Sequence, residues 1–108
     1  MADVATLTAI ANDYGYHRVF SRQLEMCGQP GDLLVVLSGS GGSANILNAI
    51  DVAKAKGIST WAVVGGGKAA ELADYTLITG GNMHDCEQEQ LKIGHTVADL
   101  LKTRLTLV

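Results

Sequence analysis

The sequence has no excess of positive charge. Its eight Lys and Arg residues are outnumbered by eleven Asp and Glu residues, so the formal net charge at pH 7 is −3, and no basic cluster occurs. Binding to nucleic acid depends on many cationic contacts with phosphates. This charge balance therefore excludes a nucleic-acid-binding role.

Long apolar runs and paired cysteines are also missing. The longest apolar run, residues 33–37, is far too short to span a bilayer, and the first residues lack the basic start of a signal peptide. We therefore expect a cytoplasmic protein with no membrane partner. Cys27 and Cys86 are more than half the sequence apart and have no CxxC partner. We expect free thiols rather than a zinc knuckle or a disulfide framework.

What is present favours one small α/β domain. The chain has 108 residues, of which 47% are hydrophobic, enough for a single core. Apolar runs of strand length alternate with segments of helical periodicity, which favours parallel strands joined by right-handed crossovers. Helices are predicted at residues 4–11, 17–27, 44–56, 68–73 and 86–105, and buried strands at residues 32–37, 58–64 and 75–79.

A loop of serine and glycine alone, residues 38–43, follows the first predicted strand and precedes a helix. Exposed N–H groups and the positive end of a helix dipole favour an anion there, and serine hydroxyls add donors. A serine-capped turn is the alternative interpretation. The dinucleotide pattern is matched only weakly, because glycines rather than an acid follow the next strand. The predicted ligand is a small phosphorylated molecule, bound by Ser38, Gly39, Ser40, Gly41 and Ser43.

His84, Glu87 and His95 are spaced at i, i+3 and i+11, which places them along one stripe of the last predicted helix. Such a stripe can supply general acid and base groups, or ligands for a divalent metal. The alternative is a solvated surface acid beside a histidine at a packing interface.

Several motifs together resemble the sugar isomerase (SIS) domain, and within it the phosphoheptose isomerases. They are the run NDYGYHRVFSRQ, the PGD before the first strand, the serine loop, and IGH in the last helix. The resemblance covers residue 9 to the C-terminus. It implies a three-layer α/β/α fold with a flavodoxin-like parallel sheet, and isomerisation of sedoheptulose 7-phosphate to a heptose phosphate.

The resemblance also assigns roles to residues. In the family, serines of a loop with the pattern STSGNS bind the sugar phosphate, which corresponds to Ser38, Ser40 and Ser43 here. The family's C-terminal acid/base histidine, a metal ligand in some members, corresponds to His95. Glu87 replaces a glutamine that touches substrate or metal, and His84 replaces an Asp or Thr. A zinc ion held by His84, Glu87 and His95 is thus one possibility that the family implies.

Family members have a further N-terminal portion that carries a glutamate base, so the resemblance implies that residues 1–108 form a single, partial SIS domain. Its sheet is expected to have about three strands, with an open apolar edge at residues 32–37. We therefore expect a homo-oligomer, a dimer or a tetramer, with Tyr14, Tyr16 and Phe20 at interfaces. The second functional hypothesis is a non-catalytic SIS module that binds phosphosugars or regulates a partner.

Overall fold

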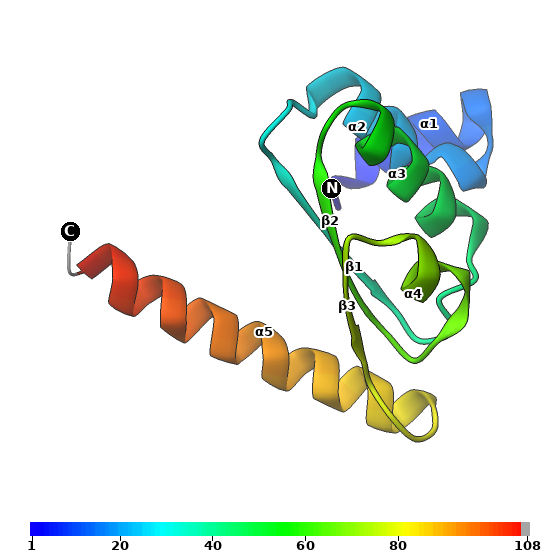
Figure 1. Cartoon of the computed structure of the whole chain (residues 1–108). Coiled ribbons are helices and arrows are strands. Elements are labelled where there is room, and N and C mark those ends of the chain that lie inside the picture. The colour runs from blue at the N-terminus through cyan, green and yellow to red at the C-terminus, as the bar shows by residue number, and fades with distance from the viewer. Residues whose placement is uncertain (107–108) are drawn as a thin grey trace.

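Three parallel strands form the centre of the structure (Figure 1). The computed structural model describes residues 1–106. The strands β1 (Leu33–Ser38), β2 (Ser59–Val64) and β3 (Tyr75–Ile78) pair in the order β1-β2-β3. The helices are α1 (Val4–Tyr14), α2 (Ser21–Cys27), α3 (Ala44–Ala55), α4 (Gly67–Leu72) and α5 (Met83–Thr106), and Tyr16–Arg18 form the 3-10 turn η1. The predicted α/β class and the parallel sheet are confirmed.

The helix after the serine loop shows how closely local signals set the boundaries. It was expected over residues 44–56, and α3 ends at Ala55. Gly57 follows with a φ of +71°, the left-handed conformation in which glycine commonly terminates a helix. The chain then enters β2 within two residues.

The helix predicted over residues 17–27 is wrong in its first half. Residues Tyr16–Arg18 form a 3-10 turn, and α2 begins only at Ser21. Gly15, with a φ of +96°, ends α1 and turns the chain sharply. The tighter turn brings Val19 to a fully buried position, so burial of this side chain outweighs continuation of the α-helix.

The last helix begins earlier than predicted, at Met83 rather than near Cys86. The side-chain Oδ1 of Asn82 accepts a hydrogen bond from the Asp85 N–H at 3.0 Å, and Asp85 Oδ2 accepts one from the Asn82 N–H at 3.4 Å. This reciprocal arrangement is a capping box, and it fixes the start of α5.

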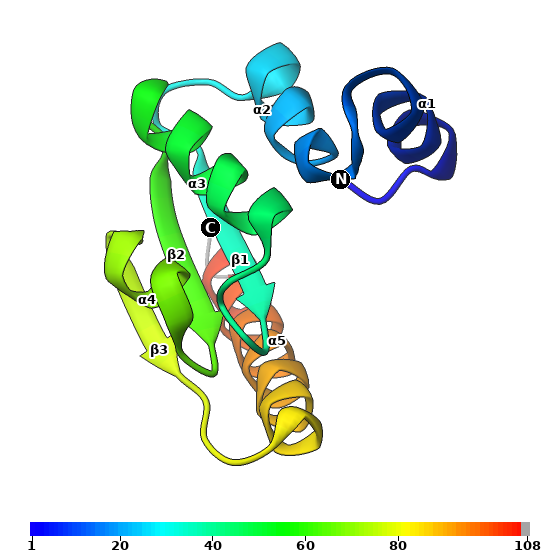
Figure 2. The same cartoon turned by 90° about the vertical axis from the view of Figure 1, so that its right-hand side faces the viewer.

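One face of the sheet carries the core. Leu34 and Val36 of β1, with Ala62 and Val64 of β2, pack against the buried face of α3, which includes Ile50. Figure 2 shows α3 lying along this face. The register pairs Leu34 with Thr60 and Val36 with Ala62, so alternate residues of neighbouring strands point the same way.

The opposite face is largely uncovered, which corrects the expectation of strands buried on both sides. Leu33, Val35 and Leu37 are between 45% and 56% exposed, and Tyr75 and Leu77 on β3 are also exposed. Of the elements that the structure describes, only α5 lies on this side, and beyond its first turns it projects away from the sheet (Figures 1 and 2). None of the helices within residues 1–106, α5 included, combines the length and hydropathy needed to cross a membrane.

Candidate phosphate-binding site

The serine loop lies at the carboxyl end of β1, as predicted. Residues 38–43, called the phosphate loop below, connect β1 to α3 at the lower edge of the sheet in Figure 2. A second glycine-rich turn, residues 65–67, follows β2 at the same edge. The Gly65 N–H donates to the carbonyl oxygens of Gly39 at 3.0 Å and Ser38 at 3.3 Å, and the Ala69 N–H donates to Gly41 at 2.9 Å. The two turns therefore support each other through their backbones.

Glycine is required where the two turns touch. Gly41 is buried and has a φ of +66°, and a Cβ at this position would overlap the carbonyl oxygen of Gly66. A Cβ at Gly67 would in turn overlap the carbonyl oxygen of Ser40. The loop composition thus serves close backbone packing as well as access for a ligand.

The serine hydroxyls are partly used inside the loop. Ser38 Oγ accepts a hydrogen bond from the Gly41 N–H at 3.0 Å, and Ser40 Oγ accepts one from the Gly42 N–H at 3.2 Å. Each hydroxyl keeps its proton to donate to a ligand. Ser43 occupies the N-cap position of α3, but its side chain makes no capping hydrogen bond. Its hydroxyl is exposed with the rest of the residue.

The first turn of α3 offers backbone donors. The N–H groups of Ile46 and Leu47 both donate to the Ser43 carbonyl at 3.1 Å. Within residues 1–106, the N–H groups of Ala44 and Asn45 have no acceptor, as is usual for the start of a helix. The first turn carries no acidic side chain. This end of α3 therefore combines free N–H donors with the positive end of the helix dipole.

The start of α5 packs against the phosphate loop. A Cβ at Gly39 would overlap the side chain of Met83, and Cys86, one turn later, lies against Gly65. The sequence showed the glycines after the second strand, but their contact with the phosphate loop and these two contacts of α5 were not predicted. The triplet of glycines directly after the second strand was a usable signal, because parallel strands end at the same edge of a sheet.

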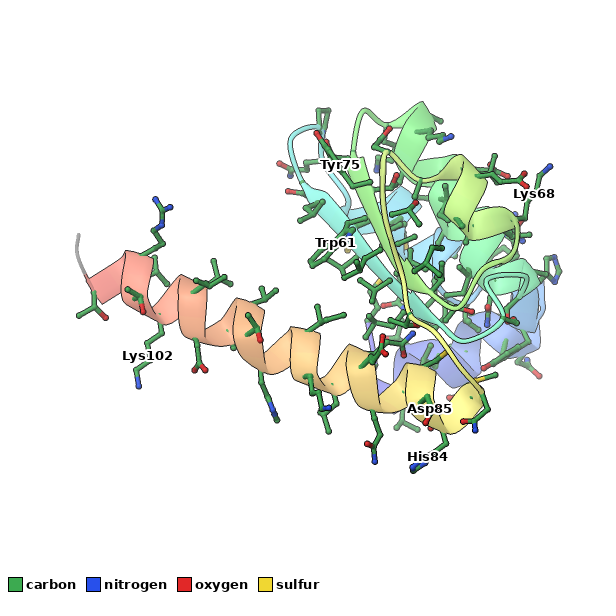
Figure 3. The ribbon with its side chains drawn as sticks, turned by 60° about the horizontal axis from the view of Figure 1, so that its bottom comes forward. Trp61, Lys68, Tyr75, His84, Asp85 and Lys102 are labelled. Atoms are coloured by element: carbon green, nitrogen blue, oxygen red, sulfur yellow. The ribbon has the colours of Figure 1, made fainter. Side chains whose placement is uncertain are left out.

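His84, Glu87 and His95 all lie on α5 and are exposed. His84 and Glu87 are neighbours one turn apart, but His95 lies about two turns beyond Glu87. An α-helix rises about 1.5 Å per residue, so His84 and His95 are about 16 Å apart along the axis. Figure 3 shows His84 on the side of α5 away from the sheet. Within residues 1–106, no group of three or more His, Cys, Asp or Glu side chains can hold a metal ion. The described residues of one chain therefore do not assemble the predicted zinc site by themselves.

Comparison of sequences finds phosphoheptose isomerases among the relatives of this chain. The chain is 47% identical over 106 residues to the phosphoheptose isomerase of Sulfurimonas denitrificans, covering 95% of this chain and 54% of the relative. It is 42% identical to that of Rhodospirillum rubrum, covering 95% and 56%. The chain thus spans about half the length of the curated relatives it matches.

Solved structures show the same similarity. The phosphoheptose isomerase from Neisseria gonorrhoeae matches with a TM-score of 0.87 at 33% identity, over 92% of this chain and 58% of that one. A phosphoheptose isomerase from Francisella tularensis matches with a TM-score of 0.89 at 30% identity, over 94% and 59%. Residues 1–65 match the family described as the SIS domain. By its fold, and by a family match over more than half its length, the chain belongs to the SIS domain family.

Proposed function

We propose that this chain binds a sugar phosphate and takes part in the phosphoheptose isomerase reaction, the interconversion of sedoheptulose 7-phosphate and a heptose phosphate. The observation that carries the proposal is the start of α3, where Ser43 caps no backbone group and free N–H donors face outward. The names and identities of the relatives support the choice of substrate. A cytoplasmic location belongs to the same proposal.

In this reaction the phosphate loop holds the phosphate group at one end of the sugar. Ser38, Ser40 and Ser43 donate their hydroxyl protons, and the first N–H groups of α3 complete the cradle. At the other end of the sugar, His95 moves a proton between neighbouring carbons through an enediol. Glu87, nearer the loop on α5, contacts the substrate. The isomerisation needs one further acid/base group from outside this chain.

Association with other polypeptide chains is part of the proposal. Among residues 1–106 no strand pairs with the outer edge of β1, and a groove of about 300 Å³ runs beside it, lined by Met1, Phe20, Ile46, Ala49 and residues 34–37. The exposed Leu33, Val35 and Leu37 continue this apolar surface. Unpaired apolar edges and faces favour association. We expect a dimer or a tetramer, and a solution mass equal to that of one chain would refute this.

The phosphate-binding step is tested most directly by Ser43→Ala. The Ser43 hydroxyl makes no capping hydrogen bond, so its removal leaves the internal contacts of the loop intact. A hydrogen bond to a charged group contributes about 1.5–3 kcal/mol, so the Kd for sedoheptulose 7-phosphate should rise about tenfold or more. Ser59→Ala, at the exposed start of β2, is the control. Equal affinities of Ser43→Ala and the unmodified chain would overturn the phosphate site.

Turnover is tested separately, by following heptose phosphate formation from sedoheptulose 7-phosphate. His95→Gln should lower the rate of product formation about 10²–10⁴-fold, the contribution of a proton-transfer group, while leaving binding within about twofold. Lys102→Gln, also exposed on α5, is the control. Product formation by His95→Gln at the original rate would remove His95 from the mechanism.

A non-catalytic phosphosugar-binding module is the second candidate function. The positions of His95 and Glu87 favour it, because eight residues of helix separate them by about 12 Å along α5. Within one chain these two side chains do not form a paired acid and base at one reacting atom. Tight binding of sedoheptulose 7-phosphate with no product at any enzyme concentration would establish this function instead.

A further inference from the structure

Cys86 lies where three segments of the chain meet. Its residue is 4% exposed, and its Sγ lies 3.5 Å from the carbonyl oxygen of Thr79 and 3.7 Å from that of Gly80. On the other side, a Cβ added at Gly65 would lie 3.0 Å from the sulfur. The thiol therefore fills the space between the first turn of α5, the end of β3 and the turn after β2.

Gly65 transmits this contact to the phosphate loop. Its N–H is the shared donor to the carbonyl oxygens of Ser38 and Gly39. Met83, one turn before Cys86, packs on Gly39 from the same helix. Because Gly39 and Gly65 have no side chains that could absorb a displacement, a shift of α5 moves the loop backbone itself.

The same region contains a hydroxyl without a partner. Thr79 is 1% exposed, and its Oγ1 has no hydrogen-bond partner among the described residues. An unpaired buried hydroxyl destabilises the closed arrangement. Most residues of α5 from 87 onward are exposed, although Gln90 Nε2 donates to the Val63 carbonyl oxygen at 2.9 Å. The packing of Met83 on Gly39 and of Cys86 on Gly65 therefore helps to hold the start of α5 against the two glycine turns.

We propose that Cys86 is a positioning residue that couples the phosphate loop to helix α5. The inference rests on the proposed phosphate binding, and it adds that the loop reaches full affinity only when the Cys86 thiol holds α5 in place. By the same coupling, phosphate on the loop holds α5 closed, since the effect of one site on the other is reciprocal. Ligand binding would thereby fix the helix that carries Glu87 and His95.

Binding of inorganic phosphate to variants of the full chain tests the first half of the proposal. Cys86→Ala removes the sulfur and should raise the Kd for phosphate at least about fivefold, the lower range of coupling between sites. Cys86→Ser keeps a donor toward the two carbonyl groups and should restore affinity to within about twofold. Cys27→Ala, which changes the exposed cysteine, should leave the Kd unchanged.

A general loss of stability is separated from positioning by Ile58→Ala. Ile58 is buried just before β2, at the end of the sheet opposite the phosphate loop, and its truncation should lower the melting temperature without changing the Kd for phosphate. Phosphate binding by Cys86→Ala with the original Kd overturns the coupling alone. A failure of the unmodified chain to bind phosphate overturns the proposed function itself, so the two failures are distinguishable.

The reactivity of the Cys86 thiol tests the second half. A thiol reagent should modify the exposed Cys27 first and Cys86 only after local opening of α5. If the form with α5 locally open does not bind phosphate, phosphate at ten times its Kd should slow the modification of Cys86 about elevenfold. Cys27 in the same sample is the internal reference. A rate for Cys86 that does not change with phosphate would refute the coupling.

A third measurement needs no ligand. An alanine at Gly65 would overlap the Gly39 carbonyl and press on the Cys86 sulfur, whereas an alanine at Gly42 meets nothing closer than Ser40 Oγ at 4.0 Å. Gly65→Ala should therefore speed modification of Cys86 several-fold, and Gly42→Ala should not. Equal rates in the two variants would show that Gly65 does not connect the thiol to the loop.

Discussion

Replacement of Gly41 by alanine is the sharpest test of the packing between the two glycine turns. Two separate costs arise at this position. A side chain at a φ of +66° adopts the left-handed conformation, which costs about 1–2 kcal/mol. The new Cβ also overlaps the Gly66 carbonyl oxygen, and that oxygen belongs to backbone that cannot rotate away.

The second cost, the overlap with the Gly66 carbonyl oxygen, arises because the two glycine turns must separate to make room for the new Cβ. Separation of the turns strains their packing by about 1–3 kcal/mol. It also breaks the 2.9 Å hydrogen bond from the Ala69 N–H to the Gly41 carbonyl, a loss of about 1 kcal/mol. The total is about 3–6 kcal/mol, a large share of the 5–15 kcal/mol that stabilises an ordinary domain. Gly41→Ala should therefore be strongly destabilised.

Urea unfolding followed by circular dichroism measures this loss, with Gly42→Ala as the matched control. Gly42 is the next residue, is exposed and has no positive φ, so its replacement should change the unfolding free energy by no more than about 0.5 kcal/mol. The m-values should agree if both variants unfold in two states. Equal midpoints for the two variants would refute the interpretation of the loop as two interlocked backbone turns.

Three further predictions concern contacts away from the loop. Lys56→Met should lower the free energy of unfolding by about 1–2 kcal/mol in a thermal melt, because Lys56 Nζ donates to the carbonyl oxygens of Leu24 and Glu25 at 2.9 Å each. The exposed Lys54, changed to Met, should cost almost nothing. Asp74→Ala should cost about 1–3 kcal/mol in urea, because Asp74 Oδ2 accepts the buried Thr60 N–H at 2.8 Å; no loss would refute this. The Thr6 hydroxyl and the Thr6 N–H both donate to Asp3 Oδ2 and lower the pKa of Asp3 below its ordinary value. The stabilising effect of Asp3 is therefore complete above that ordinary value and is lost as pH falls through the lowered pKa. Amide spectra of α1 recorded against pH should show that its first turn frays as Asp3 is protonated. The same pH dependence in the Asp3→Asn variant would contradict the role of Asp3 as the cap.

Elements set by local chemistry were predictable from the sequence. The apolar run before the serine loop forms β1, and Gly57 ends α3. The capping box at Asn82 was also visible in the sequence, and its recognition would have placed the start of α5 correctly. These signals act within a few residues, so no knowledge of the tertiary structure is needed to interpret them.

Features that depend on distant segments were not predictable. An apolar run such as residues 33–37 indicates burial of both faces, yet Val35 is 45% exposed because α5, which lies on that side, projects away from the sheet beyond its first turns. The spacing of His84 and His95 places them on one stripe of α5, but it does not show whether another ligand or catalytic group lies near them. Periodicity reports which residues share a face and leaves open what that face meets.

The internal hydrogen bonds of the phosphate loop bear on its ligand selectivity. Because Ser38 and Ser40 use oxygen lone pairs to accept backbone N–H groups, their protons are directed away from those bonds. The free groups at the start of α3 are N–H donors, and no acid lies in its first turn. The loop thus presents mainly donors at one spot of a chain whose net charge is −3. Selection of an anion here arises from oriented dipoles within one helical turn, which the charge of the whole molecule does not override.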